Sequence, residues 1–345
     1  MADQTAYGGV KQIYRHVDVL NSLGIDAAVV QGRRGFRATW FENITRVVHP
    51  PLILTEQDLL VVPEWLASEL PQLIPGVPKV VLNQNAYYTW HNMRWSDTHP
   101  YFLTQNLRSI ICVSDDNRRY LKHAFPGFDV DRVHYSFDSS TLRPGLKRRQ
   151  VAYMPRKRSD DVRQVLGILH ARGVLNSWEV VPIAGLPFAR VAEILSNTAV
   201  FLSSSLNEGF GMPPAEALAC GAYVIGYSGF GGSELFDSRY TTLVPEGDVQ
   251  TFAWELEAWL LAHPVEEPLG AGTEASQWLL STYSPERELN DLQEVYERIL
   301  AHPPLRPLRA TLRVEDTYLS NERPTTRWRT AAWHAKVGVR GLLGP

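Results

Sequence analysis

The spacing of apolar residues alternates along the chain between a helical pattern and a strand pattern. After Gly8-Gly9, apolar residues recur every three or four positions up to Gly24, which predicts an amphipathic helix that ends there. Short apolar runs rich in β-branched residues follow at 27–30, 59–62, 79–82, 110–113 and 133–137. Such runs are typical of parallel strands that are buried on both faces. The first part of the chain is therefore predicted to contain a parallel sheet.

The alternation starts again after a turn-rich, basic stretch that contains Asp138, Pro144 and Gly145 and ends with Lys147-Arg148-Arg149, which has the composition of a linker. Strands are predicted at 151–154, 179–183, 200–203 and 223–227, and helices between them at 161–171, 189–195 and 213–219. Two successive βα series predict an α/β protein with two doubly wound, Rossmann-like domains, at residues 1–145 and 146–302. Ligands bind at the carboxyl ends of such strands, so we expect the site in the cleft between the domains.

Length, charge and cysteine content narrow the class of protein. A chain of 345 residues is longer than a single core usually supports. The formal net charge of −3 gives no overall attraction for nucleic acid, so no nucleic-acid partner is expected. Cys112 and Cys220 lie in apolar runs, which favours buried thiols. Because no signal-peptide pattern and no membrane-spanning apolar run occur, we expect a cytoplasmic protein.

The segment from Glu208 to Glu216 lies between a predicted strand and a predicted helix. Pro213 suits the first helical position, where a missing N–H costs nothing. Free N–H groups at the helix start can bind phosphate or sugar oxygens, and Gly209 and Gly211 allow close approach of the backbone. We place Glu216 in the first helical turn, where its carboxylate can accept hydrogen bonds from both hydroxyls of a ribose. The alternative is a structural loop followed by an acid that the helix dipole favours.

In spacing and composition this segment resembles the E-x7-E motif of the retaining GT-B glycosyltransferases, the GT4-like group or glycosyl transferases group 1. Glu208 and Glu216 match the two acids. Other stretches look like further signatures of that family: Val113-Ser114, 137–144, Gly231-Gly232-Ser233-Glu234, Leu243-Val244-Pro245 and Asp248. The resemblance spans most of residues 8–300, and it implies a GT-B fold of two Rossmann-like domains that face each other across a cleft.

The resemblance also implies an activity. A sugar would move from a nucleoside diphosphate sugar to a hydroxyl of a glycan or glycolipid acceptor, with retention of configuration, in polysaccharide biosynthesis. Glu208 would contact the donor sugar near the reacting carbon, and Glu216 the ribose. The further donor contacts would be Gly209, Phe210, Gly211, Met212, Pro213, Gly8 and Gly9. The family normally has a strand before the glycine pair, and residues 1–7 are too few and too polar to supply it, so we expect a start that is truncated, misassigned or atypical.

A cation cluster at 154–158 matches the family's Gly-Arg pair in part. Arg156 stands at the arginine position, and Lys157 or Arg158 substitutes for a lysine expected later in the chain. A cation there would neutralise the charge that grows on the departing diphosphate. We therefore assign Arg156 and Lys157 a catalytic role and Arg158 a donor contact. The alternative is a solvated basic turn.

The acceptor side departs further from the family. Asn83 and Asn85 stand at a strand end where many relatives carry a histidine, and amides can orient hydroxyls but are weak bases. His91 is a further acid/base or positioning candidate, with an ordinary loop histidine as the alternative. The pairs Asp115-Asp116 and Asp160-Asp161 lack a D-x-D pattern, so solvated acids at helix starts explain them better than a metal site. The resemblance implies a metal-independent reaction without a cofactor.

The tail, residues 303–345, is basic and contains several prolines. As a helix it would place on one face Trp328, Ala332, Ala335, Val339 and Leu342. Flanking basic residues fit peripheral contact with the inner face of a membrane or with a partner. The alternatives are packing on the first domain and an unfolded tail.

Two rival functions stay open from the sequence. One keeps the GT-B fold and changes the chemistry, to a sugar-nucleotide epimerase or a phosphorylase. The other is a catalytically silent protein that binds sugar nucleotides, which the imperfect cation motif and the missing first strand leave open. An assay of donor hydrolysis or sugar transfer discriminates between a silent protein and an enzyme.

Overall fold

The computed structural model describes residues 8–32, 34–55, 57–65, 77–90, 106–263, 270, 272–301 and 312–314. The chain forms two compact units, one of Met1–Asp58 with Pro307–Pro345 and one of Leu59–Arg306. The division into domains at 1–145, 146–302 and 303–345 stays a prediction. The structure of the basic tail is described only at Leu312–Val314, and the helix predicted in the tail lies outside the described residues, as do residues 1–7.

The first unit contains α1 (Gly8–Ser22), which confirms the predicted amphipathic helix. Tyr14 and Val17 pack from this helix into a small core. Gly24, with a φ of 79°, follows the helix as predicted. A parallel pair is formed by β1 (Val29–Val30) and β2 (Val47–Val48), and an antiparallel pair by β3 (Leu52–Leu54) and β13 (Leu312–Val314).

The second unit contains a first parallel sheet in the order of the chain. Its strands are β4 (Leu60–Pro63), β5 (Lys79–Asn83), β6 (Leu107–Cys112) and β7 (Val130–Arg132). All five residues of β5 are buried, as the apolar run predicts. The strand predicted at 133–137 is wrong, because β7 ends at Arg132; the Val133 N–H still donates to the Cys112 carbonyl of β6 at 2.9 Å, and residues 134–137 form no strand. The side chains of Tyr135 and Phe137 are buried for a reason other than strand pairing, because they pack into the core of the second sheet.

A second parallel sheet in this unit has the order β9-β8-β10-β11-β12. Its strands are β8 (Arg148–Tyr153), β9 (Glu179–Pro182), β10 (Thr198–Ser204), β11 (Tyr223–Tyr227) and β12 (Thr241–Leu243). The end of the predicted linker is corrected, because Arg148 and Arg149 open β8, while residues 138–147 lie outside helices and strands. The Arg149 guanidinium stacks on Trp178, 5.1 Å from the ring centroid, and donates to the His263 carbonyl. A basic strand start was therefore mistaken for a turn.

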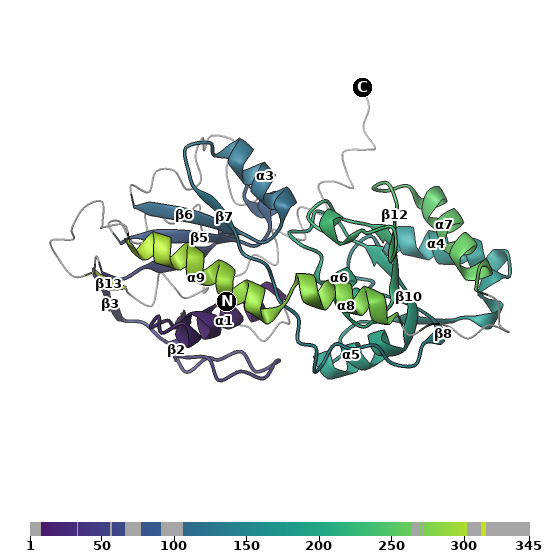
Figure 1. Ribbon diagram of the computed structural model, residues 1–345, viewed down its shortest axis with the longest axis horizontal. Coiled ribbons are helices and arrows are strands. Elements are labelled where there is room, and N and C mark those ends of the chain that lie inside the picture. The colour runs from purple at the N-terminus through teal and green to yellow at the C-terminus, as the bar shows by residue number, and fades with distance from the viewer. Residues whose placement is uncertain are drawn as a thin grey trace, which may run out of the picture. The chain divides into compact units, whose positions relative to one another are not determined.

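Helices cover both faces of this second sheet (Figure 1). On one face lie α4 (Ser159–Ala171) and α7 (Val249–Leu261), which pack on each other. On the other face lie α5 (Phe188–Asn197), α6 (Met212–Ala219) and α8 (Thr273–Thr282). The first sheet carries α3 (Asp115–Ala124) between β6 and β7, and α9 (Pro285–Ala301) returns to that sheet. The doubly wound α/β architecture predicted from the sequence is confirmed.

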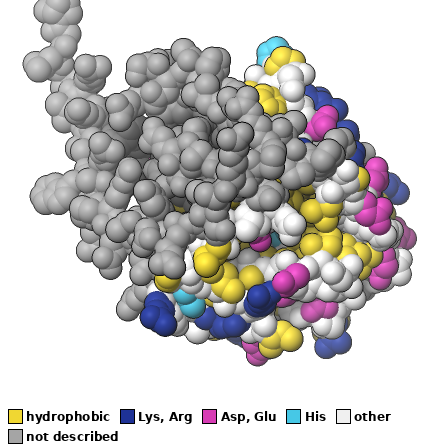
Figure 2. Space-filling view, turned by 90° about the vertical axis from the view of Figure 1, so that its left-hand side faces the viewer, with side chains coloured by type: hydrophobic (Ala, Val, Ile, Leu, Met, Phe, Trp, Pro, Cys, Tyr) yellow, Lys and Arg dark blue, Asp and Glu magenta, His cyan; other side chains and the backbone are white. Residues whose placement is uncertain are grey.

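Two observations concern the helices and one face of the described residues. None of the described helices has both the length and the apolar content needed to cross a bilayer. On the face shown in Figure 2, basic and acidic side chains of the described residues are interspersed. This mixture agrees with the small net charge of −3.

Candidate active site

The candidate site lies where the strand order of the second sheet reverses. From β8 the chain crosses to β9, and from β10 it crosses to β11 on the opposite side. The loops that follow β8 and β10 therefore leave the sheet in opposite directions at the carboxyl ends of these strands, where a crevice for a ligand is expected in such sheets. The loop after β8 carries Arg156, Lys157 and Arg158, and the loop after β10 carries Glu208.

Lys157 and Glu208 meet across this crevice. The Lys157 Nζ lies 2.7 Å from the Glu208 Oε1, and it also donates to the Leu206 carbonyl at 2.9 Å. The two side chains are only 18% and 16% exposed, so solvent screens their attraction less than on an open surface. The structure thus brings together two predicted catalytic side chains from different strands, while the third, Arg156, is exposed on the same turn.

Arg158 has a different position from Lys157. Its Nη2 lies 3.0 Å from the Glu246 Oε2, and its guanidinium covers the Tyr227 ring at 4.8 Å. The other carboxylate oxygen of Glu246 accepts a hydrogen bond from the Gly229 N–H at 2.8 Å. Glu246 therefore ties the cation loop to the loop after β11. Sequence analysis missed Glu246, although it lies between two quoted signature positions, Pro245 and Asp248.

The glycines of the Glu208 loop permit contact between protein backbones. A Cβ on Gly209 would lie 1.7 Å from the Gln84 carbonyl oxygen at the end of β5. A Cβ on Gly231 would lie 2.2 Å from the Glu208 carbonyl oxygen. We expected these glycines to let the backbone approach a ligand. In the structure they let it approach other backbone atoms of the protein. Gly211, with a φ of 92°, caps α6 in a conformation that favours glycine.

The start of α6 differs slightly from the prediction. The helix begins at Met212, so Pro213 is its second residue and Glu216 its fifth, which places Glu216 in the second turn and not the first. Glu216 and Met212 are half-buried. The Phe210 ring is 2% exposed and packs edge-on against Tyr135 at 5.4 Å between centroids. The Phe210 side chain therefore belongs to the core, and only its main chain can contact a donor.

Unusual backbone conformations surround Glu208. Among the described residues, the non-glycine positions with positive φ are Arg158 at 44°, Asn207 at 47° and Phe230 at 67°. Arg158 follows Lys157, Asn207 precedes Glu208, and Phe230 forms an isolated parallel bridge with Glu208. Such conformations cost free energy and concentrate at functional sites. Their grouping here is independent support for this crevice as the active site.

The acceptor-side amides serve contacts within the protein. The Asn83 Nδ2 donates to the Thr89 Oγ1 at 2.9 Å. Asn85 caps the short helix η2 (Ala86–Tyr88), where its Oδ1 accepts from the Tyr87 N–H, and its Nδ2 donates to the Asn207 carbonyl at 2.8 Å. Asn85 thus links the end of β5 to the Glu208 loop. The third acceptor-side candidate, His91, lies outside the described residues.

The buried carboxyl of Glu64, which was not predicted from the sequence, contacts the residue between these two asparagines. Glu64 follows β4, is 7% exposed, and accepts a hydrogen bond from the Gln84 N–H at 3.1 Å. Burial raises the pKa of Glu64 to about 7. The Tyr135 hydroxyl donates to the Gln84 Oε1 at 3.0 Å, so Gln84 is held from two sides. An acid directly after a buried strand was the available signal for Glu64.

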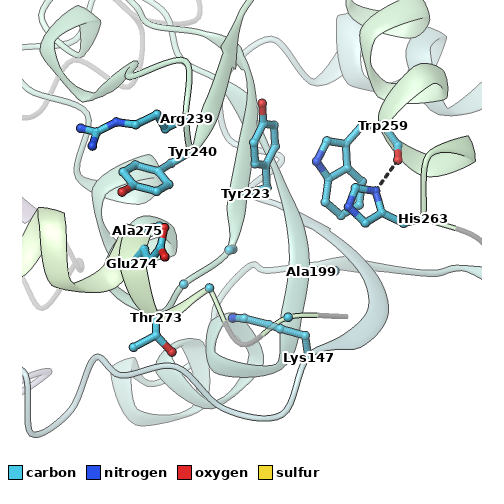
Figure 3. Close-up of a pocket in the computed structure, with 14 residues that line it drawn as sticks. Lys147, Ala199, Tyr223, Arg239, Tyr240, Trp259, His263, Thr273, Glu274 and Ala275 are labelled. Atoms are coloured by element: carbon cyan, nitrogen blue, oxygen red, sulfur yellow. Dashed lines mark hydrogen bonds between the residues drawn. The ribbon is translucent and has the colours of Figure 1, made fainter. Parts of the chain in front are cut away.

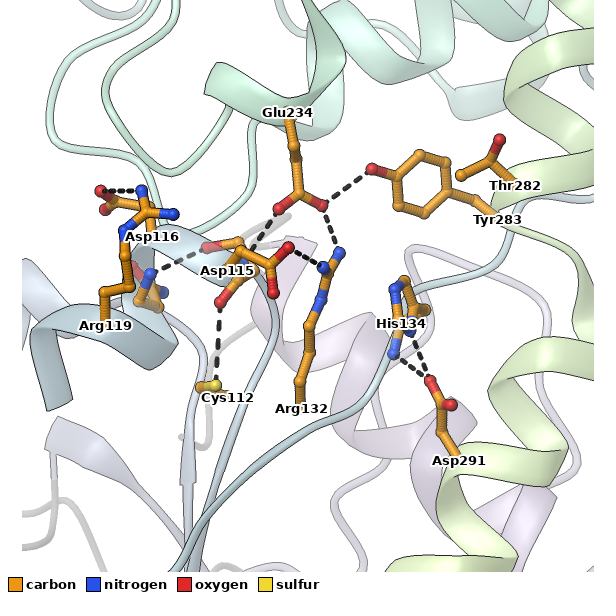
Figure 4. Close-up of polar contacts among 12 residues, drawn as sticks. Cys112, Asp115, Asp116, Arg119, Arg132, His134, Glu234, Thr282, Tyr283 and Asp291 are labelled. Atoms are coloured by element: carbon orange, nitrogen blue, oxygen red, sulfur yellow. Dashed lines mark hydrogen bonds and ion pairs between the residues drawn. The ribbon is translucent and has the colours of Figure 1, made fainter. Parts of the chain in front are cut away.

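Glu234, quoted for its place in the family signature, holds parts of the second unit together (Figure 4). It lies in the short helix η4 (Ser233–Leu235) and accepts from the Asp115 N–H at 2.9 Å and the Tyr283 hydroxyl at 2.8 Å. It also pairs with Arg132 at the end of β7, and Arg132 in turn lies 2.8 Å from Asp115. Glu234 therefore ties the loop after β11 to the first sheet.

The acid pairs occupy helix starts, as predicted. Asp115 and Asp116 lie in the first turn of α3, and Asp160 and Asp161 in the first turn of α4. Among the residues that the structure describes, no group of three or more His, Cys, Asp and Glu side chains could hold a metal ion. Cys112 and Cys220 are buried free thiols, as expected.

A separate cavity of about 460 Å³ lies at the opposite edge of the second sheet (Figure 3). Lys147, Tyr223 and Tyr240 line it, and each stands at or just before the start of a strand. The Lys147 ammonium donates to the Ser196 and Cys220 carbonyls, and burial lowers its pKa to about 8. This cavity is at the amino edge, and none of the predicted site residues lines it.

Comparison with known proteins agrees with this geometry. Residues 169–275 match the family described as Glycosyl transferases group 1. The chain resembles a group 1 glycosyltransferase. An alpha-1,6-glucosyltransferase of Actinobacillus pleuropneumoniae serotype 7 is 28% identical over 255 residues, which cover 69% of this chain and 75% of that protein. Together these findings support glycosyltransferase activity.

Solved structures of GT-B glycosyltransferases have the same fold. Sucrose-phosphate synthase from Thermosynechococcus elongatus superposes with a TM-score of 0.60 at 13% identity, over 86% of this chain and 94% of that one. A glycosyltransferase from Rickettsia africae gives a TM-score of 0.55 at 11% identity, over 86% and 97% of the two chains. At such identities the likeness concerns the fold alone, and the predicted GT-B fold is confirmed.

Proposed function

We propose that this protein transfers a sugar from a nucleoside diphosphate sugar to a hydroxyl of a carbohydrate or lipid-linked acceptor, with retention at the anomeric carbon. The observation that carries the proposal is the Lys157–Glu208 pair at the switch point between β8 and β10. A sheltered ammonium beside a carboxylate suits a reaction in which a diphosphate leaves one side of a sugar while positive charge grows on the sugar.

The donor would lie between the two loops and the start of α6. The diphosphate would accept hydrogen bonds from Lys157 and from the first N–H groups of α6, where the helix dipole also favours an anion. Glu216, in the second turn, would accept hydrogen bonds from the ribose hydroxyls. Gly8 and Gly9, at the start of α1, remain proposed donor contacts.

The chemistry follows from the charges of these groups. As the bond between the anomeric carbon and the diphosphate oxygen breaks, the diphosphate gains negative charge, which Lys157 and Arg156 stabilise. Glu208 faces the sugar and stabilises the positive charge on the anomeric carbon. The acceptor oxygen enters on the same face and forms the new bond, and its proton passes to the departing diphosphate. Configuration is therefore retained.

No metal ion takes part in this proposal, because the cation loop supplies the positive charge. We expect turnover to persist in excess EDTA, measured as release of the nucleoside diphosphate in the presence of an acceptor. Activity that EDTA abolishes and Mg²⁺ or Mn²⁺ restores would overturn the metal-free reaction. No cofactor is required, since the nucleoside diphosphate sugar is itself a substrate.

The same proposal places the enzyme in the cytoplasm, in polysaccharide biosynthesis, with the tail at 303–345 in contact with the inner face of the membrane. Flotation with anionic vesicles, for the full chain and for a chain that ends at residue 302, tests this placement. Equal flotation of the two proteins would remove the membrane role of the tail.

The decisive experiment begins with a thermal-shift screen against a panel of nucleoside diphosphate sugars, because a ligand that binds the folded state raises its apparent stability. Calorimetry with the selected donor then compares the unaltered protein with Glu216→Gln. Loss of a charged hydrogen bond should weaken binding by about 1–3 kcal/mol. If no donor stabilises the protein and none is hydrolysed or transferred, the proposed function is wrong.

A further inference from the structure

Phe230 stands where the backbone calls for a glycine. Its φ is 67°, in the left-handed region that residues with a Cβ rarely adopt. The preceding residue, Gly229, also has a positive φ, of 63°. The Phe230 side chain is not hidden in a core, because the residue is 44% exposed. Backbone strain of this kind concentrates at functional sites, so the presence of a phenylalanine in place of a glycine here indicates a role for its ring.

The position of Phe230 is set by the catalytic loop. Phe230 forms an isolated parallel bridge with Glu208, and the Glu208 N–H donates to the Gly229 carbonyl at 2.8 Å. The Phe230 N–H donates to the Ser228 Oγ at 3.1 Å. The ring is therefore held beside the carboxylate that we place next to the transferred sugar.

A second aromatic ring reaches Phe230 from the first sheet. Tyr87, in η2 after β5, has its ring centroid 5.7 Å from that of Phe230, with 39° between the planes. Its hydroxyl donates to the Asp116 Oδ2 at 2.7 Å, and its ring packs on Tyr120 at 5.4 Å. The Asn85–Asn207 hydrogen bond described above joins the two loops here. The two rings are thus held by contacts from both sheets of this unit.

We propose that Phe230 and Tyr87 form a platform for a sugar ring of the acceptor, which makes the acceptor a carbohydrate. The inference rests on the proposed function and names the substrate class for the acceptor half of that site. A pyranose has a face of C–H groups that matches an uncharged aromatic surface, and the Asp116 carboxylate at the edge can accept from sugar hydroxyls.

Other parts of the substrates fit this platform less well. A nucleobase is separated from the reacting carbon by the ribose and two phosphates, so it cannot lie beside Glu208 when the donor sugar does. Phosphate oxygens require N–H groups or cations, which the two rings do not offer. The acceptor oxygen must come within about 3–3.5 Å of the anomeric carbon, which places the acceptor ring directly beside the donor sugar.

The test uses the backbone conformation of Phe230. Phe230→Gly removes the ring and suits the positive φ, so we expect a melting temperature no lower than that of the unaltered protein. The acceptor KM should rise roughly tenfold. Donor hydrolysis without acceptor and calorimetric binding of the nucleoside diphosphate should stay unchanged. Phe230→Trp and Tyr87→Phe, which keep a ring, should retain the acceptor KM within about a factor of three.

The acceptors in this test are methyl glycosides and disaccharides of glucose, N-acetylglucosamine, galactose and mannose. If the unaltered protein transfers sugar to one of them and Phe230→Gly leaves its KM unchanged, the platform is overturned while the proposed function stands. An equal rise in donor KM would place the rings under the donor sugar and overturn the acceptor assignment. If the unaltered protein shows neither transfer nor donor hydrolysis, the proposed function fails and the inference fails with it.

Discussion

The two edges of the second sheet differ in what they do with charge. At the carboxyl edge, Lys157 meets the Glu208 side chain, a partner that a substrate can replace or share. At the amino edge, Lys147 is bound to the main-chain carbonyls of Ser196 and Cys220, which no ligand displaces without opening the fold. The amino edge has the cavity of about 460 Å³, but the Lys147 ammonium in it is bound to the main chain and so stabilises the fold.

Backbone conformation makes the same distinction. The three non-glycine residues with positive φ among the described residues all lie in loops at the carboxyl edge. At the amino edge, the rings of Tyr223, Trp259 and His263 instead stack on one another, with Trp259 and His263 centroids 4.0 Å apart. A hollow lined by mutually packed rings indicates little about chemistry. The polarity of parallel strands is the better guide to the site.

The largest expected effect is on Glu208. Glu208→Gln removes the charge that would stabilise the reacting sugar, so turnover should fall by about two to three powers of ten. Binding of the free nucleoside diphosphate, measured by calorimetry, should change little. The control is Glu274→Gln, in the amino-edge cavity, which should keep full turnover. Equal losses in turnover and nucleotide binding would contradict the assignment of Glu208 to the sugar.

Lys157 should rank next. Lys157→Ala removes the sheltered ammonium, and we expect a loss of about two powers of ten in turnover, with a smaller loss for the exposed Arg156→Ala. The matched control is Arg163→Ala, because Arg163 is a surface arginine paired only with the exposed Asp160 in the described contacts. Arg149 is unsuitable as a control, since it stacks on Trp178. Equal activity of the Lys157 and Arg163 variants would show that the cluster Arg156-Lys157-Arg158 is a solvated turn without a catalytic role.

A glycine at each edge tests the backbone contrast. Gly209→Ala would put its Cβ 1.7 Å from the Gln84 carbonyl oxygen, so the Glu208 loop must shift. We expect a loss of about 2–3 kcal/mol in the free energy of unfolding, measured with urea, and reduced turnover. The Cβ of Gly270→Ala, at the amino-edge cavity, meets no atom of the described residues within 4 Å, so this variant should change neither quantity. Similar stabilities of the two variants would contradict the tight contact at Gly209.

Much of this architecture could be predicted from the sequence. The apolar runs of β5 and β11 are continuous because both faces of these strands are buried, so their positions were predictable. The run at 133–137 misled because periodicity reports burial and not hydrogen bonding to a neighbouring strand. Arg149 misled because its charge satisfies a carbonyl and a ring that are distant in sequence.

The site residues were predictable only where their position follows from the neighbouring sequence. Glu208 and Lys157 stand in loops directly after strands, so sequence order alone placed them at one edge. Glu64, Glu246 and Phe230 were missed because their roles depend on contacts across loops or with the other sheet. The acceptor role of Asn85 stays a prediction, while its amide also joins two loops of the protein, which no local pattern indicates.

At the amino edge we expect a substitution to have no effect on turnover. Lys147→Met should leave transfer unchanged, but it should alter how stability depends on pH. Burial lowers the pKa of folded Lys147 to about 8, from 10.5 for an ordinary lysine. Between these values the unfolded chain holds a proton that the folded chain has released, so the unaltered protein gains stability as pH rises. Relative to Lys147→Met, this gain should reach about 3 kcal/mol between pH 8 and pH 10.5, measured by urea unfolding at each pH. Because both proteins share every other titrating group, a difference in stability that stays constant over this range would show that Lys147 keeps its proton, held by the two carbonyls.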